Sequence, residues 1–135
     1  MANTLYPKAK QSFLTGEINL TSDTIKIQLI DLADYTYSAA HDNLDDVPAA
    51  GRVGTAVALA SKTVTDGVFD AADATFTAVS GHVSEALIIY KDTGTASTSK
   101  LIAFIDAASS GLPVTPNTGN ITVTFDSGTN KIFAL

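Results

Sequence analysis

Hydrophobic and polar residues alternate along most of this chain. Within residues 24–31, the aliphatic side chains of Ile25, Ile27 and Leu29 alternate with Lys26, Gln28 and Ile30. A period of two places successive side chains on opposite faces of a strand, so this pattern predicts a half-buried strand. Similar runs predict strands at 52–60, 61–65, 68–69, 74–79, 120–125 and 130–135. Asp66-Gly67 separates two of these runs and predicts a tight hairpin turn.

Two further runs, 85–90 and 101–105, are apolar almost without interruption. Such runs are typical of strands that are covered on both faces, so we expect two central strands that pair with each other. The segment between them, residues 91–100, consists mainly of small and polar residues and predicts a solvated hairpin loop.

The N-terminal segment has a period close to 3.6 and predicts a short helix over residues 4–14. Thr4 is the expected N-cap, Pro7 falls in the first turn, and Gly16 ends the helix. The apolar residues expected to share its inner face are Leu5, Ala9 and Phe13. A helix of this length is marginal alone, so we expect it to be held by packing.

Seven or eight short strands, separated by turns about every 8–12 residues, predict an antiparallel β-sandwich, with a barrel as the alternative. Residues 1–135 are expected to form a single β domain, with the helical segment 1–16 packed on or beside it. Residues 34–50 break the strand pattern and predict a long loop excursion with one helical turn near 41–45.

Composition agrees with a folded domain, since 45% of the 135 residues are hydrophobic and 16% are charged. The absence of cysteine excludes disulfides, thiolate metal sites and a cysteine nucleophile. No run reaches the roughly 18 apolar residues that span a bilayer, and no signal-peptide core is evident. We therefore expect no membrane partner and synthesis in the cytoplasm.

The formal net charge of −6 works against binding to a polyanion. The basic residues are scattered and are not grouped with aromatic residues that could stack on bases. No nucleic-acid partner is expected.

One dense acidic group, Asp42, Asp45 and Asp46 with Asp34 nearby, could supply oxygen ligands for Ca²⁺. The group lacks the alternating Asp-x-Asp-x-Asp-Gly pattern of a calcium loop, so a solvated turn is the favoured interpretation. We predict no metal and no cofactor.

His41 and His82 are the only two histidines, adjacent in sequence to Asp42 and close to Glu85 respectively. A hydrolytic triad also needs a nucleophile, and no Gly-x-Ser-x-Gly motif accompanies either histidine. The other acidic residues lie mainly at expected strand ends, where aspartate commonly caps the backbone. We predict no catalytic residues and no enzymatic activity.

Tyr35 and Tyr37 alternate and would project to one side of an extended segment. They could contact a partner subunit or pack into the core beneath the loop. The candidate partner-contact residues in this segment and the N-terminal helix are Leu5, Tyr6, Phe13, Tyr35, Tyr37, Leu44 and Val47.

Several motifs extend over nearly the whole chain: Asn3-Thr-Leu-Tyr-Pro-Lys-Ala-Lys10, Ala33-Asp-Tyr-Thr-Tyr-Ser-Ala-Ala-His41, Leu44-Asp-Asp-Val-Pro-Ala-Ala50, Asp66-Gly-Val-Phe-Asp-Ala71, Tyr90-Lys-Asp-Thr-Gly94, Gly111-Leu-Pro-Val-Thr-Pro-Asn117 and Asn130-Lys-Ile-Phe133. In these motifs the chain resembles a family of small virion structural proteins of tailed bacteriophages and prophages. Proteins of this kind are associated with the head or with the tail.

The resemblance implies a structural protein located in the virion, and we expect a capsid decoration or cement protein. Its expected partners are the major capsid protein and other copies of itself, as a homo-oligomer in the particle. A minor tail or fibre-associated protein is the first alternative, with tail proteins as partners. The second alternative is a carbohydrate-binding module for the host surface, although the chain has no tryptophan for sugar stacking.

Overall fold

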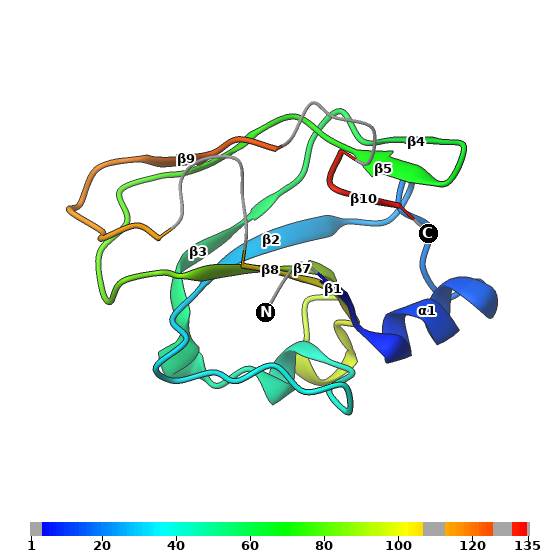
Figure 1. The fold of residues 1–135 in the computed structure, drawn as a ribbon, viewed down its shortest axis with the longest axis horizontal. Coiled ribbons are helices and arrows are strands. Elements are labelled where there is room, and N and C mark those ends of the chain that lie inside the picture. Colours follow the sequence, from blue (N-terminus) through cyan, green and yellow to red (C-terminus); the bar gives the residue numbers. More distant parts are fainter. Residues whose placement is uncertain (1–3, 107–112, 126–130, 135) are drawn as a thin grey trace.

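The computed structural model describes residues 4–106, 113–125 and 131–134, which form a mainly β fold of sandwich type (Figure 1). The largest sheet is antiparallel and has the order β1-β8-β7-β2-β3. Its strands are β1 (Thr4–Leu5), β8 (Leu101–Ile105), β7 (Ala86–Lys91), β2 (Ile25–Ile30) and β3 (Arg52–Ala58). Because β1 and β3 are different edge strands, this sheet is open and does not close into a barrel.

Two smaller antiparallel sheets complete the β structure. One has the order β10-β5-β4 and the other pairs β6 with β9. Their strands are β4 (Thr63–Thr65), β5 (Val68–Asp70), β6 (Ala74–Phe76), β9 (Ile121–Val123) and β10 (Phe133–Ala134). Figure 1 shows these strands on one side of the large sheet, while α1 (Pro7–Leu14) and residues 31–50 lie on the other side.

The expected central pair is confirmed, since β7 and β8 pair antiparallel with Leu87 opposite Ile105. Every residue of β8 and the first five residues of β7 are buried, as the continuous apolar runs indicated. The connection between them is a polar loop that contains the 3₁₀ turn η3 (Ala96–Thr98).

Strand β2 is more deeply buried than the alternating pattern predicted, because both of its faces are covered. Gln28, expected on a solvated face, is only 4% exposed. The register of β3 shifts opposite Ile27 and Leu29, and Gly54 adopts a positive φ of 69° there. The Gln28 Nε2 donates a hydrogen bond to the Val53 carbonyl at 2.8 Å, which satisfies a polar side chain inside the core.

The hairpin at Asp66-Gly67 is confirmed, with φ values of 52° and 81° at the two turn residues. Positive φ at both positions is the requirement of a type I′ turn, which suits the twist of the flanking strands. Within the expected strand at 130–135, Phe133 and Ala134 form β10 and pair with β5, whereas residues 130 and 135 lie outside the described residues.

The N-terminal helix begins later than predicted. Thr4 is not its N-cap, because Thr4 and Leu5 form β1 and pair with Phe104 and Ala103 of β8. The helix starts at Pro7, and the preceding Tyr6 donates its N–H to the Ile102 carbonyl at 3.0 Å. Hydrogen bonding at the edge of the sheet therefore replaces the expected first helical turn.

None of the helices in the described part of the chain has the length and apolar character needed to cross a membrane.

The excursion at 34–50 contains two short 3₁₀ turns, η1 (Leu44–Asp46) and η2 (Ala49–Gly51). The first lies close to the expected helical turn at 41–45. Its capping residue is Asn43, and the Asp46 carboxylate accepts the Asp42 N–H at 2.8 Å.

Acid is expected to destabilise the fold through aspartates that accept hydrogen bonds. The Asn19 N–H, with help from Lys91, lowers the pKa of Asp23, and the Lys26 ammonium, 2.8 Å away, lowers the pKa of Asp92. An aspartate whose pKa is lower in the folded chain than in the unfolded chain stabilises the fold. This stabilisation is complete above the pKa of the unfolded chain, about 3.9, and it is lost as the pH falls through the pKa of the folded chain.

We therefore expect the thermal unfolding midpoint, followed by circular dichroism, to fall as the pH drops below about 4. The fall should be shallower in Asp92→Asn, because that variant has one fewer depressed carboxylate. An identical pH dependence in Asp92→Asn and the parent chain would contradict the assignment.

Candidate functional site

The seven residues predicted to contact a partner divide into two groups by burial. Four of them are buried, with at most 7% of each residue exposed to solvent: Tyr6, Tyr35, Leu44 and Val47. In this fold they contribute to the core, so for Tyr35 the structure favours core packing beneath the loop. The remaining three, Leu5, Phe13 and Tyr37, are half-buried and pack against that core.

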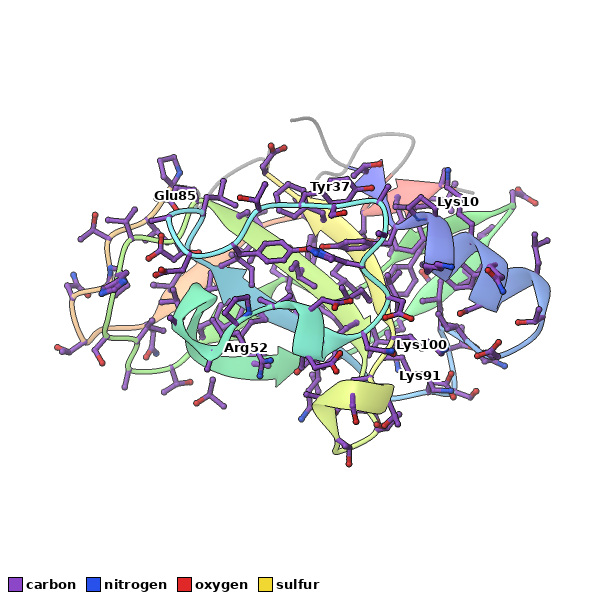
Figure 2. All side chains as sticks on the ribbon, turned by 90° about the horizontal axis from the view of Figure 1, so that it is seen from below. Lys10, Tyr37, Arg52, Glu85, Lys91 and Lys100 are labelled. Atoms are coloured by element: carbon purple, nitrogen blue, oxygen red, sulfur yellow. The ribbon has the colours of Figure 1, made fainter. Side chains whose placement is uncertain are left out.

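The structure nevertheless brings the two predicted contact segments together. The rings of Tyr6 and Tyr37 lie 5.1 Å apart, and the Tyr6 and Tyr35 hydroxyls are hydrogen-bonded at 2.8 Å. Figure 2 shows α1, which carries Lys10, and the loop that carries Tyr37 along the same side of the molecule. We refer to the surface formed by α1 and residues 32–43 as the α1-loop face.

A chain of hydrogen bonds lies beneath this face. The Tyr35 hydroxyl joins the buried Tyr6 hydroxyl to Nδ1 of His41, which is 2.9 Å away. Burial raises the pKa of both tyrosines, so their hydroxyls remain protonated and available as donors at neutral pH. His41 therefore contacts a phenol here, whereas a hydrolytic triad orients its histidine with a carboxylate.

The rest of the excursion is tied to β3 by Arg52. Its guanidinium donates to the carbonyl oxygens of Leu44 at 2.9 Å and Val47 at 2.7 Å. Burial acts to raise the pKa of Asp46, but hydrogen bonds from the Asp42 and Asn43 N–H groups outweigh it and lower the pKa. Asp46 thus caps the turn η1.

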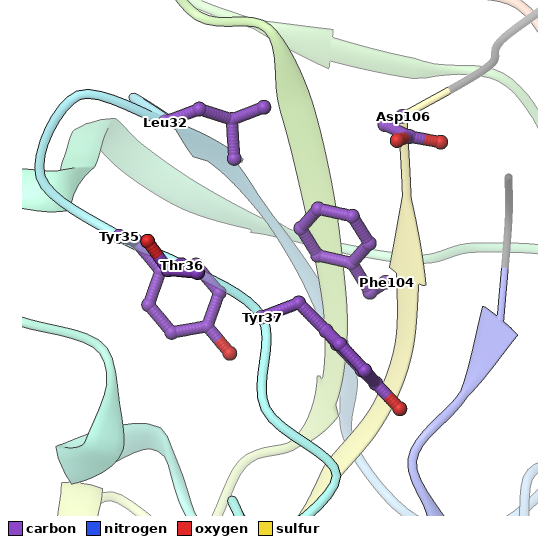
Figure 3. A pocket seen from close by; sticks show the side chains of 6 residues that line it. All are labelled: Leu32, Tyr35, Thr36, Tyr37, Phe104 and Asp106. Carbon is purple, nitrogen blue, oxygen red and sulfur yellow. The ribbon is translucent and has the colours of Figure 1, made fainter. Parts of the chain in front are cut away.

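A hollow of about 300 Å³ opens on the α1-loop face (Figure 3). Its lining residues are Leu32, Tyr35, Thr36, Tyr37, Phe104 and Asp106. The rings of Tyr37 and Phe104, with centroids 5.5 Å apart, make it largely aromatic. A volume of this size lies at the lower end of the range for small-molecule sites.

A second cluster joins Asp31, Asp34 and His82. Asp31 follows the last residue of β2, and His82 precedes β7, which pairs with β2. The register places Ile30 opposite Ala86, so the loops leaving this end of the strand pair meet. The Ser84 hydroxyl, fully buried, hydrogen-bonds the main chain of Ile30 and strengthens this junction.

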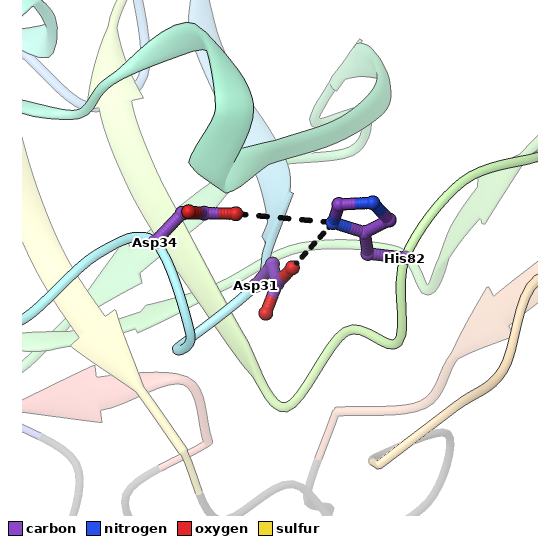
Figure 4. Close-up of side chains that lie close together, drawn as sticks. All are labelled: Asp31, Asp34 and His82. Atoms are coloured by element: carbon purple, nitrogen blue, oxygen red, sulfur yellow. Dashed lines mark hydrogen bonds and ion pairs between the residues drawn. The ribbon is translucent and has the colours of Figure 1, made fainter.

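Within the cluster, the carboxylates of Asp31 and Asp34 both face the same nitrogen of the His82 imidazole (Figure 4). Its Nδ1 is 2.9 Å from Oδ2 of Asp31 and 3.8 Å from Oδ2 of Asp34. Asp31 is only 3% exposed, whereas the side chain of His82 is 72% exposed. One potential ligand atom from each residue lies within 4.8 Å of the other two.

This cluster was not found from the sequence. The nearest carboxylate in sequence to His82 is Glu85, yet Glu85 instead accepts the Leu32 N–H at 2.9 Å. The partner of His82 is Asp31, 51 residues away. A usable signal was an aspartate directly after a buried strand, but only the pairing of β2 with β7 identifies the histidine that it meets.

Comparison with known proteins adds no family to these observations. Neither a protein-family model nor a curated protein sequence matches this chain.

Proposed function

We propose that this chain is a structural protein of a tailed-bacteriophage particle, and specifically a capsid decoration protein that binds the major capsid protein lattice. The motifs described above, which resemble those of small virion proteins, support the class. Many copies of one small domain, each with a modest interface, can together stabilise a repetitive shell.

The observation that carries the proposal is the α1-loop face. Two segments separated in sequence by residues 15–31 combine there into one surface, braced by the Tyr6–Tyr35 hydrogen bond and the Tyr6–Tyr37 ring contact. Arg52 anchors the far end of the excursion through main-chain carbonyls. A surface pre-organised in this way loses little conformational freedom when it binds, which favours affinity from a small contact area.

We expect changes on the α1-loop face to reduce the number of copies bound per particle. Thr36 is exposed on this face, so Thr36→Lys places a bulky charge there without disturbing the core. Removal of residues 1–4, which precede α1 in sequence and include Thr4 of β1, is a second variant that tests the N-terminal segment, and it should also lower occupancy. Occupancy is measured by incubating purified variants with particles that lack the protein and quantifying bound chain after sedimentation.

Thr122→Lys is the matched control, because Thr122 is exposed on β9, at the end of the molecule opposite α1 (Figure 1). It should bind as the parent chain does. Circular dichroism should first establish that each variant is folded. Normal occupancy of the Thr36→Lys variant would contradict a role for this face, and normal occupancy of the truncated chain would contradict a role for the N-terminal segment.

Copy number distinguishes head from tail. Electron microscopy of particles should show hundreds of copies on the shell if the chain decorates the capsid. A few to a few tens of copies, confined to the tail or its tip, would instead identify a minor tail protein and overturn the capsid assignment.

A further inference from the structure

We propose that Asp31, Asp34 and His82 bind a divalent transition-metal ion, with Zn²⁺ as the representative ion. Imidazole nitrogen and carboxylate oxygen are common zinc ligands, and water can complete the coordination shell. This inference concerns a site separate from the α1-loop contacts and does not depend on the proposed function.

The distances fit an ion after small side-chain movements. Bond lengths of about 2.0–2.2 Å place neighbouring ligand atoms of one zinc ion about 3–3.5 Å apart. His82 Nδ1 is already 2.9 Å from the Asp31 carboxylate and 3.8 Å from that of Asp34. The group with the most freedom to adjust is His82, since it is the most exposed and follows Gly81, which has a positive φ of 121°.

The charges of the cluster also favour a cation. Asp31 is nearly inaccessible to water, and a buried carboxylate is costly without a compensating charge. Within the described residues, the ion pairs of Asp31 and Asp34 are those with His82. A neutral imidazole gives Asp31 a hydrogen bond but no positive charge, whereas a divalent ion in place of the Nδ1 proton would neutralise both carboxylates.

A main-chain hydrogen bond fixes the orientation of the Asp31 carboxylate toward the proposed metal site. One of its oxygens, Oδ1, accepts the Ala33 N–H at 2.9 Å, while the other faces His82. The adjacent Leu32 N–H is bound by Glu85, and Ser84 joins the two segments at Ile30. Such outer hydrogen bonds orient metal ligands and contribute to affinity.

The test is isothermal titration of the untagged, chelator-treated full chain with Zn²⁺ at neutral pH. We expect saturable binding of one ion per chain, and a loss of affinity of at least about 10-fold in His82→Gln and in Asp34→Asn. Both side chains are substantially exposed, so both variants should fold. Zinc should also raise the thermal unfolding midpoint of the parent chain but not that of His82→Gln.

The matched controls are His41→Gln and Asp45→Asn, which remove the other histidine and an exposed aspartate outside the cluster. They should retain the affinity of the parent chain. Co²⁺ titrated in place of Zn²⁺ should give visible absorption bands that are absent in His82→Gln. The proposal is overturned if no saturable binding occurs, or if His82→Gln binds Zn²⁺ as tightly as the parent chain.

Discussion

Replacing Leu87 with alanine should lower the free energy of unfolding by about 2–5 kcal/mol, the range for removing a fully buried leucine side chain. Leu87 is 0% exposed and lies between Leu29 of β2 and Ile105 of β8, at the centre of the large sheet. Small domains are stable by only about 5–15 kcal/mol, so this change alone could remove much of that margin. Urea denaturation followed by circular dichroism measures the effect.

Leu14→Ala makes the same chemical change on the surface and is the matched control. Leu14 is 89% exposed at the last position of α1. Its replacement should alter stability by less than about 0.5 kcal/mol. Equal losses in the two variants would show that the large sheet is not the core of the fold.

The Tyr35→Phe substitution should destabilise the chain by about 1–3 kcal/mol. The lost hydroxyl hydrogen-bonds both Tyr6 and His41, and its removal leaves the Tyr6 hydroxyl, which is fully buried, without this partner. Thermal and urea unfolding of the purified variant measure the change.

Tyr37→Phe is the comparison, because the Tyr37 hydroxyl forms no hydrogen bond with the described residues while its ring occupies the same region. It should cost less than Tyr35→Phe. The double variant Tyr6→Phe/Tyr35→Phe should lose less stability than the sum of the two single variants, since removing both hydroxyls leaves neither unpaired. Strict additivity would contradict a hydrogen bond between them.

Local patterns in the sequence predicted much of the β structure. The continuous apolar runs predicted the buried β7–β8 pair, because a strand covered on both faces needs no alternation. Asp66-Gly67 predicted its turn because few other residue pairs tolerate positive φ at both positions.

Where the predictions differ from the structure, long-range contacts decided the outcome. The pattern around Gln28 indicated a solvated face, but the irregular register of β3 supplies main-chain carbonyls that accept its amide. Thr4 has the chemistry of a helix cap, yet its segment pairs with β8, about one hundred residues away. Neither partner could be identified from neighbouring residues.

The same limit applies to the candidate sites. The alternation of Tyr35 and Tyr37 predicted that both rings project to one side of the segment. It did not predict that Tyr35 would be buried against Tyr6 and Phe104. His82 and Asp31 meet only because β2 and β7 are neighbours in the sheet. Spatial clusters of this kind follow from topology and cannot be read from spacing along the chain.

The strand order of the large sheet has a consequence for how the chain folds. Strand β2 pairs with β7, and β1 with β8, so the centre of the sheet and its first edge both depend on contacts between sequence-distant segments. Proteins dominated by such contacts fold slowly, typically over milliseconds to seconds. On the ribosome, β1 must wait until β8 has been synthesised, so the earliest residues to emerge are among the last able to reach their native positions.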